Sequence, residues 1–98
     1  MKVDVVAHIQ AKPGQEAAVR AVLEGFIAPT RREAGCLRYD LFVDADDPTK
    51  FTFIEEWSSR EALNVHGQSA HITAGRAKMP DLLAGPSWVQ VLLTAASS

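Results

Sequence analysis

The chain has 98 residues, of which 47% are hydrophobic, and it carries a formal net charge of −2. These values predict a single globular domain over residues 1–98. Basic residues are scattered along the chain, which argues against nucleic acid or an anionic membrane as a partner. No run approaches the roughly 18 apolar residues of a membrane span, and the first residues lack the apolar core of a signal peptide. The lone Cys36 excludes an intramolecular disulfide, so we expect a cytoplasmic protein.

The first segment, from Val3 to Ala11, alternates apolar and polar side chains with the period of a half-buried strand. Val6 departs from this alternation, which indicates that the second face of the strand is partly covered too. His8 lies on that second face, so we expect it at a dimer interface or on the surface. Pro13 and Gly14 end the strand, because proline cannot donate to the ladder and glycine eases the turn.

A helix with one apolar stripe is predicted next, and the stripe should face a sheet. Its residues are Val19, Val22, Leu23, Phe26 and Ile27. Pro29 should kink or loosen this helix, because its ring opposes the carbonyl of Gly25. Gly35 is expected just past the helix end, where a left-handed conformation costs glycine least.

Two antiparallel strands should follow, from Cys36 to Val43 and from Lys50 to Trp57, joined by a turn rich in aspartate. Period-two alternation places Leu37, Tyr39, Leu41 and Val43 together on one face of the first strand. It places Phe51, Phe53, Glu55 and Trp57 together on one face of the second. Tyr39 is therefore expected to point inward with Leu37 and Leu41.

The last third of the chain predicts a helix in two pieces and a final strand. Ser58 and Glu61 have capping-box spacing, so the first piece should begin there and run to about His66. Ser69 can cap a second piece that reaches roughly Leu83, with an interruption at Pro80. The final strand is expected from Trp88 to Thr94. The order is β-α-β-β-α-β, the α+β ferredoxin-like topology with a four-stranded antiparallel sheet.

Several motifs in this order resemble the antibiotic biosynthesis monooxygenase family. They are GCLRY at 35–39, DP at 47–48, EEW at 55–57, and the histidines at 66 and 71. The resemblance extends from Val3 to about Leu93 and implies a homodimer, a dimeric α/β barrel in which two sheets face each other. The helix-free sheet face gives a physical reason as well, because Val6 and Phe42 make it too apolar to leave in water.

Glu55 and Trp57 are the first candidate catalytic residues. The resemblance implies that Trp57 lines a pocket between sheet and helices, although packing in the core would equally explain a tryptophan there. Glu55 shares its strand face and would point into the same pocket. A buried carboxylate needs a partner or has its pKa raised, as in a general base. The alternative is a salt bridge to Arg38 or Arg76.

The histidine pair lies on either side of the predicted helix break. A spacing of five does not place His66 and His71 on one helix face, and no HExxH or cysteine cluster accompanies them, so no metal site is expected. The resemblance implies a catalytic role for His71 and substrate binding for His66. Capping the last carbonyls of the helix would explain His66 equally well.

Tyr39 and Phe53 are candidate substrate-binding residues, since both lie on the expected inner face. The Tyr39 hydroxyl must find a partner if it is buried, and it could either orient a substrate oxygen or make a structural hydrogen bond. The sequence carries no GxGxxG, P-loop, nucleophile, flavin or haem motif, so no cofactor is expected. An oxidation without a bound cofactor requires a substrate that, once it is deprotonated, can itself reduce dioxygen.

The resemblance thus implies a cofactor-independent monooxygenase that oxidises a small hydroxylated aromatic compound or quinol with dioxygen. One alternative is an isomerase of a small keto compound, and another is a non-catalytic dimeric module that binds a small ligand. Haem degradation is disfavoured, because relatives with that activity carry asparagine where this chain has Ala7. An enzyme is favoured if Glu55, His71 and Trp57 converge on one cavity. The binding module is favoured if Glu55 pairs with an arginine and the histidines face solvent.

Overall fold

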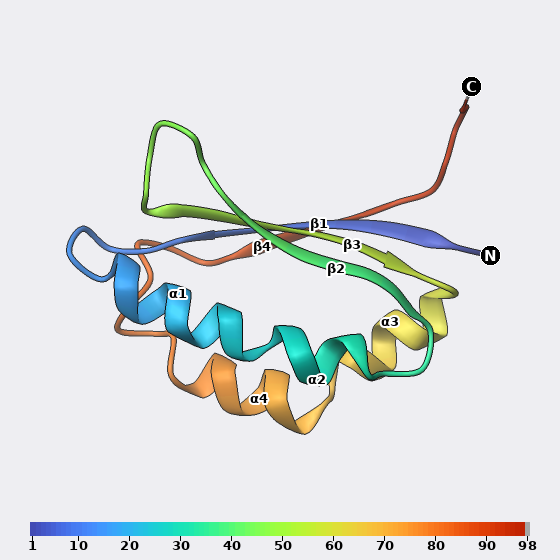
Figure 1. The fold of residues 1–98 in the computed structure, drawn as a ribbon, viewed down its shortest axis with the longest axis horizontal. Helices are drawn as coiled ribbons and strands as arrows, with labels where there is room; N and C mark the ends of the chain where they lie inside the picture. The colour runs from blue at the N-terminus through green and yellow to red at the C-terminus, as the bar shows by residue number, and fades with distance from the viewer. Residues whose placement is uncertain (98) are drawn as a thin grey trace.

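A four-stranded antiparallel sheet covered on one face by helices makes up the computed structural model, which describes residues 1–97 (Figure 1). The strand order is β2-β3-β1-β4. The elements in chain order are β1 (Val3–Gln10), α1 (Glu16–Gly25), α2 (Ile27–Arg31), β2 (Cys36–Val43), β3 (Lys50–Trp57), α3 (Arg60–Gly67), α4 (Ala70–Ala77) and β4 (Trp88–Leu92). The predicted ferredoxin-like α+β topology is confirmed. None of the helices within residues 1–97 is long and apolar enough to cross a membrane.

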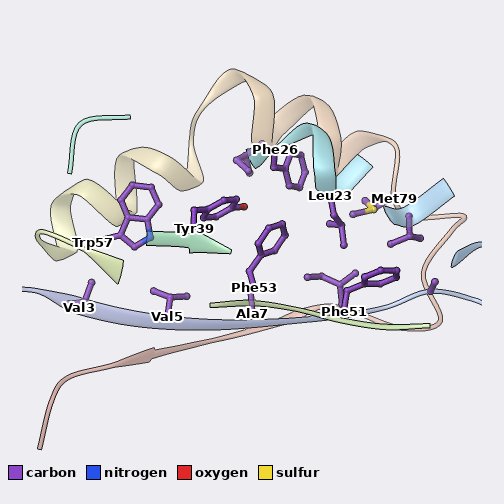
Figure 2. Packing of buried hydrophobic residues seen from close by; sticks show 14 residues of the cluster. Val3, Val5, Ala7, Leu23, Phe26, Tyr39, Phe51, Phe53, Trp57 and Met79 are labelled. Atoms are coloured by element: carbon purple, nitrogen blue, oxygen red, sulfur yellow. The ribbon is translucent and has the colours of Figure 1, made fainter. Parts of the chain in front are cut away.

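The two central strands, β1 and β3, carry the floor of the core. Their buried residues alternate along each strand as predicted. In the register, Glu55 of β3 lies opposite Val5 of β1 on one side and Tyr39 of β2 on the other. Since directly opposed residues point to the same face of a sheet, all three point toward the helices. Figure 2 shows Tyr39, Phe53 and Trp57 in the layer between sheet and helices.

The prediction that Leu37 of β2 points toward the core is wrong. The register with β3 shifts between Cys36 and Arg38, which is a β-bulge, and an extra residue there turns the preceding side chains over. Leu37 is therefore 58% exposed, while Cys36 packs against the core in its place. Tyr39, beyond the bulge, is buried as predicted.

The predicted helices are present, but several of their ends differ. The first breaks at Phe26 into α1 and α2, since Pro29 has no N–H to donate to the Gly25 carbonyl. Ser59 rather than Ser58 caps α3, with its Oγ accepting from Ala62 N at 3.1 Å.

The later elements are shorter than the sequence predicted. α4 ends at Ala77 instead of near Leu83, because the residue before Pro80 is disfavoured in a helical conformation. β4 ends at Leu92 rather than Thr94. The segment between α4 and β4 thus forms a loop at one end of the sheet.

Gly35 lies where the chain entering β2 packs against the start of α3. It has a φ of +86° and lies in the turn between α2 and β2, four residues beyond the end of α2, rather than directly at a helix end. Its carbonyl accepts from Ser58 N at 2.8 Å. A Cβ at this position would lie 2.6 Å from Ala62 Cβ and 2.7 Å from Ser58 Oγ. Only glycine fits both the backbone conformation and the space.

We predict that Gly35→Ala lowers the free energy of unfolding by about 2–4 kcal/mol, because it adds crowding to the cost of a left-handed residue. Gly14→Ala is the matched control, since Gly14 has a φ of +88° but nothing within 4 Å of a built Cβ. That variant should lose only about 1 kcal/mol. Urea unfolding of the three proteins measures both values, and equal losses would contradict the packing account.

Candidate active site

A cavity of about 820 Å³ lies between the sheet and the helices. Its floor includes Val5, Ala7, Phe53 and Glu55, and its far side is formed mostly by residues of α1, α3, α4 and the following loop. Most of the lining side chains are aliphatic or aromatic, and the titratable ones within it are Tyr39, Glu55, His66 and Arg76. An apolar space of this size with a few convergent polar groups is typical of a small-molecule site.

Glu55 is the polar group of the cavity floor and is only 4% exposed. Its Oε1 accepts a hydrogen bond from Trp57 Nε1 at 2.9 Å. It makes no salt bridge within residues 1–97, because Arg38 pairs with acidic residues on the other face of the sheet and Arg76 donates to the Gly67 carbonyl. The arginine partner that the sequence left open is therefore not found in this part of the chain.

Burial without a positive partner raises the pKa of Glu55 to about 7. The Trp57 hydrogen bond opposes this rise, and the negative charge of Glu33 adds to it. A carboxylate with this pKa is ionised in about half of the molecules at neutral pH. It can therefore both accept and return a proton there.

Trp57 lies behind Glu55 rather than in the cavity wall. Its side chain is fully buried at the end of β3, and it is not among the residues that line the cavity. The ring lies 4.7 Å from the ring of His66, centroid to centroid. The expectation that Trp57 lines the pocket is wrong, and its contribution to the site is the N–H that it donates to Glu55.

His66 is buried in the wall of the cavity, near the end of α3. Its Nδ1 lies 2.7 Å from Glu33 Oε2, and its ring meets that of Tyr39 edge-on at 5.5 Å. Burial lowers the pKa of His66, while the Glu33 carboxylate opposes this shift. A carboxylate accepts hydrogen bonds, so the ring proton of neutral His66 lies on Nδ1.

The other ring nitrogen of His66, Nε2, has no hydrogen bond within residues 1–97. No fully buried side-chain nitrogen or oxygen in that range lacks a partner. Because His66 lines the cavity, we infer that Nε2 opens onto it with a free lone pair. The alternative that His66 only caps a helix leaves this arrangement unexplained.

His71, at the start of α4, does not line the cavity. Its Nε2 lies 2.9 Å from Thr30 Oγ1 and 3.4 Å from Glu33 Oε2. The break between α3 and α4 brings its ring within 6.1 Å of the His66 ring. Of the three residues whose convergence on one cavity would favour an enzyme, only Glu55 lines it. The catalytic residue predicted at position 71 is therefore outside the cavity, and both histidines lie beside Glu33 instead.

The side-chain ligand atoms of Glu33, His66 and His71 lie within 4.8 Å of one another, a grouping that could hold a metal ion. The sequence argument against it rested on the spacing of five and on the lack of an HExxH motif or cysteine cluster, but contact across the helix break needs neither. The 2.7 Å between Glu33 Oε2 and His66 Nδ1 is a hydrogen-bond distance. Two ligands of one tetrahedral zinc ion lie roughly 3.3 Å apart, because each bond is about 2.0–2.1 Å. The geometry therefore favours a hydrogen-bonded network.

Tyr39 and Phe53 both line the cavity, where they were expected. Their rings stack with centroids 4.5 Å apart. Burial raises the pKa of Tyr39 and keeps its hydroxyl protonated, while a hydrogen bond with Thr30 opposes that rise. Together they form an aromatic wall next to Glu55.

Sequence reasoning missed Glu33 and Thr30. Thr30 lies in α2, and Glu33 lies in the turn that leads from α2 into β2. No local pattern marks them, since their role depends on contacts with histidines more than thirty residues away. The GCLRY motif, which begins two residues after Glu33, is the one nearby signal.

Comparison with known proteins agrees with this architecture. Residues 3–78 match the family model described as antibiotic biosynthesis monooxygenase. The chain belongs to this family. It is 41% identical over 90 residues to a protein of Mycobacterium tuberculosis named "Putative monooxygenase Rv0793". The aligned residues make up 92% of this chain and 88% of that protein.

Other relatives extend the comparison. The structure of Rv0793 superposes with a TM-score of 0.92 at 37% identity, covering 100% of this chain and 99% of the other. The crystal structure of PA3566 from Pseudomonas aeruginosa gives a TM-score of 0.86 at 34% identity, covering 97% and 95%. An uncharacterised protein of Synechocystis, sll1783, is 34% identical over 87 residues, 89% of this chain. The chain spans only 59% of the length of that protein.

We predict that Glu55→Gln stabilises the protein increasingly as pH rises. The pKa of Glu55 is about 7 in the fold against 4.5 in the unfolded chain, so the folded state binds more protons between these values. Stability is therefore lost as the carboxylate ionises. The advantage of the variant over the native protein should grow by roughly 2–3 kcal/mol between pH 5 and pH 8.

Urea unfolding at both pH values measures this difference. Glu56→Gln, which alters the neighbouring glutamate on the opposite face of β3, is the matched control. An advantage of Glu55→Gln that is the same at pH 5 and pH 8 would contradict the raised pKa.

Proposed function

We propose that this protein is a cofactor-independent monooxygenase that oxidises a small hydroxylated aromatic compound or quinol with dioxygen. The observation that carries the proposal is a carboxylate with a pKa of about 7 on the floor of an apolar cavity. Family membership and the name of the mycobacterial relative support the same reaction class. The protein would supply a base, an aromatic wall and a space with little water.

Glu55 would begin the reaction by taking the phenolic proton. The resulting anion is electron-rich and passes one electron to dioxygen, which gives a substrate radical and superoxide. These combine to form a carbon–oxygen bond, and protonated Glu55 returns its proton to the peroxide. Glu55 is thereby ready for the next turnover, as a general base requires.

The second half of the reaction would form a carbonyl. A base removes the proton from the carbon that now bears the hydroperoxide, the O–O bond breaks, and hydroxide leaves. That hydroxide takes up the removed proton and departs as water. One oxygen atom thus enters the product, the other becomes water, and the substrate alone supplies the electrons.

The walls of the cavity fit a flat aromatic ring. Phe53 and Tyr39 stack beside Glu55 and would lie against the substrate ring. Apolar surroundings also raise the energy of a buried carboxylate, which makes Glu55 a stronger base than in water. His71 would act outside the cavity, contrary to the direct catalytic role that the sequence suggested.

The partner of this site would be a second copy of the chain. The sheet face that carries no helix includes Val6 and Ile54, together with Phe42 at 45% and Trp88 at 54% exposure. Trp88 also packs against the ring of His8, with 4.3 Å between the centroids and a tilt of 33° between the rings. Exposed aromatic groups on one sheet face favour association of two sheets.

For the homodimer, we predict a native mass in solution of twice the 10.6 kDa chain. Replacing Phe42 and Trp88 together by lysine places charges in the interface and should give a monomer. Val65→Lys is the control, because Val65 is 63% exposed on α3, away from that face. Light scattering after gel filtration gives the masses, and a native mass of one chain would reject the dimer.

For the reaction, we predict saturable dioxygen uptake with dihydroxynaphthalenes or quinols and a product that has gained one oxygen and lost two hydrogens. Glu55→Gln should lower kcat about 10²-fold or more, because a positioned general base contributes 10²–10⁴-fold. The rate with the native protein should rise through a pH of about 7 as Glu55 ionises. An oxygen electrode and product mass measure these quantities.

Glu24→Gln is the control, since Glu24 is an exposed residue of α1 that pairs with Arg20 and does not line the cavity. Uptake no faster than uncatalysed autoxidation would reject the monooxygenase. A product of unchanged mass would instead indicate the isomerase, and binding without conversion would indicate the ligand-binding module.

A further inference from the structure

The proposed reaction removes two protons from different atoms of the substrate, one from the hydroxyl and one from the carbon that gains oxygen, so a second base besides Glu55 would let a separate group take the carbon-bound proton. Only a few side chains that line the cavity can accept a proton near neutral pH. Tyr39 keeps its proton because burial raises its pKa, and the Arg76 guanidinium offers only donors. His66, with Nε2 open to the cavity, is the remaining candidate.

A histidine serves as a base through one nitrogen only if the other nitrogen carries the proton. For His66 that other nitrogen is Nδ1, and Glu33 Oε2 lies 2.7 Å from it. The Glu33 side chain is 15% exposed, so this contact is shielded from most of the solvent. A carboxylate in this position fixes the ring orientation and the tautomer, and it stabilises the imidazolium that forms when Nε2 takes a proton.

Glu33 is itself held in place from its other side. His71 Nε2 lies 3.4 Å from the same oxygen and 2.9 Å from Thr30 Oγ1. Thr30 is fully buried in α2, so it anchors His71 to a fixed part of the fold. A proton on His71 Nε2 can be shared between the Thr30 hydroxyl and Glu33, which keeps the carboxylate facing His66.

We propose that Glu33 is a positioning residue that keeps the proton of His66 on Nδ1, so that Nε2 acts as the second base of the cavity, and that His71 holds Glu33. This assignment rests on the proposed monooxygenase reaction for its catalytic part. It gives a role to a cluster of three titratable groups of which only one lines the cavity. It also explains why His71 lies beside the site without touching the cavity.

The other groups that face His66 are consistent with this assignment. The ring packs between Trp57 and Tyr39, which carry no charge. Arg76 and His71 disfavour a positive charge on His66, and Glu33 favours it. Glu33 is thus the group that offsets the cost of the imidazolium during turnover.

The test compares Glu33→Gln with Glu33→Asp in metal-free, EDTA-treated protein. Nitrogen-15 NMR of histidine-labelled protein reports which nitrogen of His66 carries the proton, and His66→Gln assigns the signal. We expect the Nδ1–H form in the native protein and a larger Nε2–H population in Glu33→Gln. The aspartate variant should retain much of the native form.

Kinetics provide the second measurement. Glu33→Gln should lower kcat by 10² or more with little change in KM, since Glu33 does not touch the substrate. His71→Ala should cause a smaller loss, and Glu24→Gln, which alters an exposed carboxylate of α1 outside the cavity, should cause none. An unchanged tautomer in Glu33→Gln, or a native His66 protonated on Nε2, would overturn the proposal.

The two measurements separate this proposal from the monooxygenase itself. Absence of dioxygen uptake in the native protein, together with an Nδ1–H tautomer that depends on Glu33, would reject the reaction but support the positioning role. Normal uptake with kcat unaffected by Glu33→Gln would reject the positioning role and leave the reaction standing.

Discussion

The site depends on one buried carboxylate that has no positive partner within residues 1–97. Glu55 lies on the central strand β3 between Val5 and Tyr39, and its hydrogen-bond donor is Trp57 on the same strand. Two-residue spacing on a strand places both side chains on one face, so the donor comes from the same short segment as the acceptor. One hydrogen bond reduces the cost of burying the charge without removing it, and the pKa consequently lies near neutrality. The fold thus accepts a loss of stability at neutral pH in order to hold a base in an apolar space.

The sequence correctly predicted which side chains of β3 point toward the helices, because inward and outward side chains alternate along the eight residues of this strand without interruption. The same reasoning failed at Leu37, where a bulge adds a residue that alternation cannot anticipate. Pro29 predicted the break between α1 and α2 from its missing N–H. The end of α4 was less accurate, since Pro80 marks a boundary only to within a few residues.

The network of Glu33, His66 and His71 could not be predicted, for a different reason. Each residue comes from a separate element, and only the tertiary fold brings the three together. The histidine spacing pointed away from a cluster, because residues five apart do not share one helix face. The predicted break is present, since α3 ends at Gly67 and α4 begins at Ala70, but the spacing alone cannot give the angle at which the break sets the two rings. Gly35 completes the arrangement by allowing the turn that carries Glu33 to pack against the start of α3. The break between α3 and α4 thus places both histidines beside Glu33, and one of them, His66, lines the cavity.

The raised pKa of Glu55 is the claim on which the rest depends, and NMR can measure it directly. Protein labelled with carbon-13 at the glutamate side-chain carboxyl would be titrated from pH 4 to pH 9, and the Glu55 signal would be assigned with Glu55→Gln. We expect a midpoint of about 7 for this one carboxyl. We expect a still higher midpoint in Trp57→Phe, because the hydrogen bond that favours the ionised form is lost. A midpoint near the ordinary value of 4.5 would show that the carboxylate is solvated or paired, and it would contradict the account of the site.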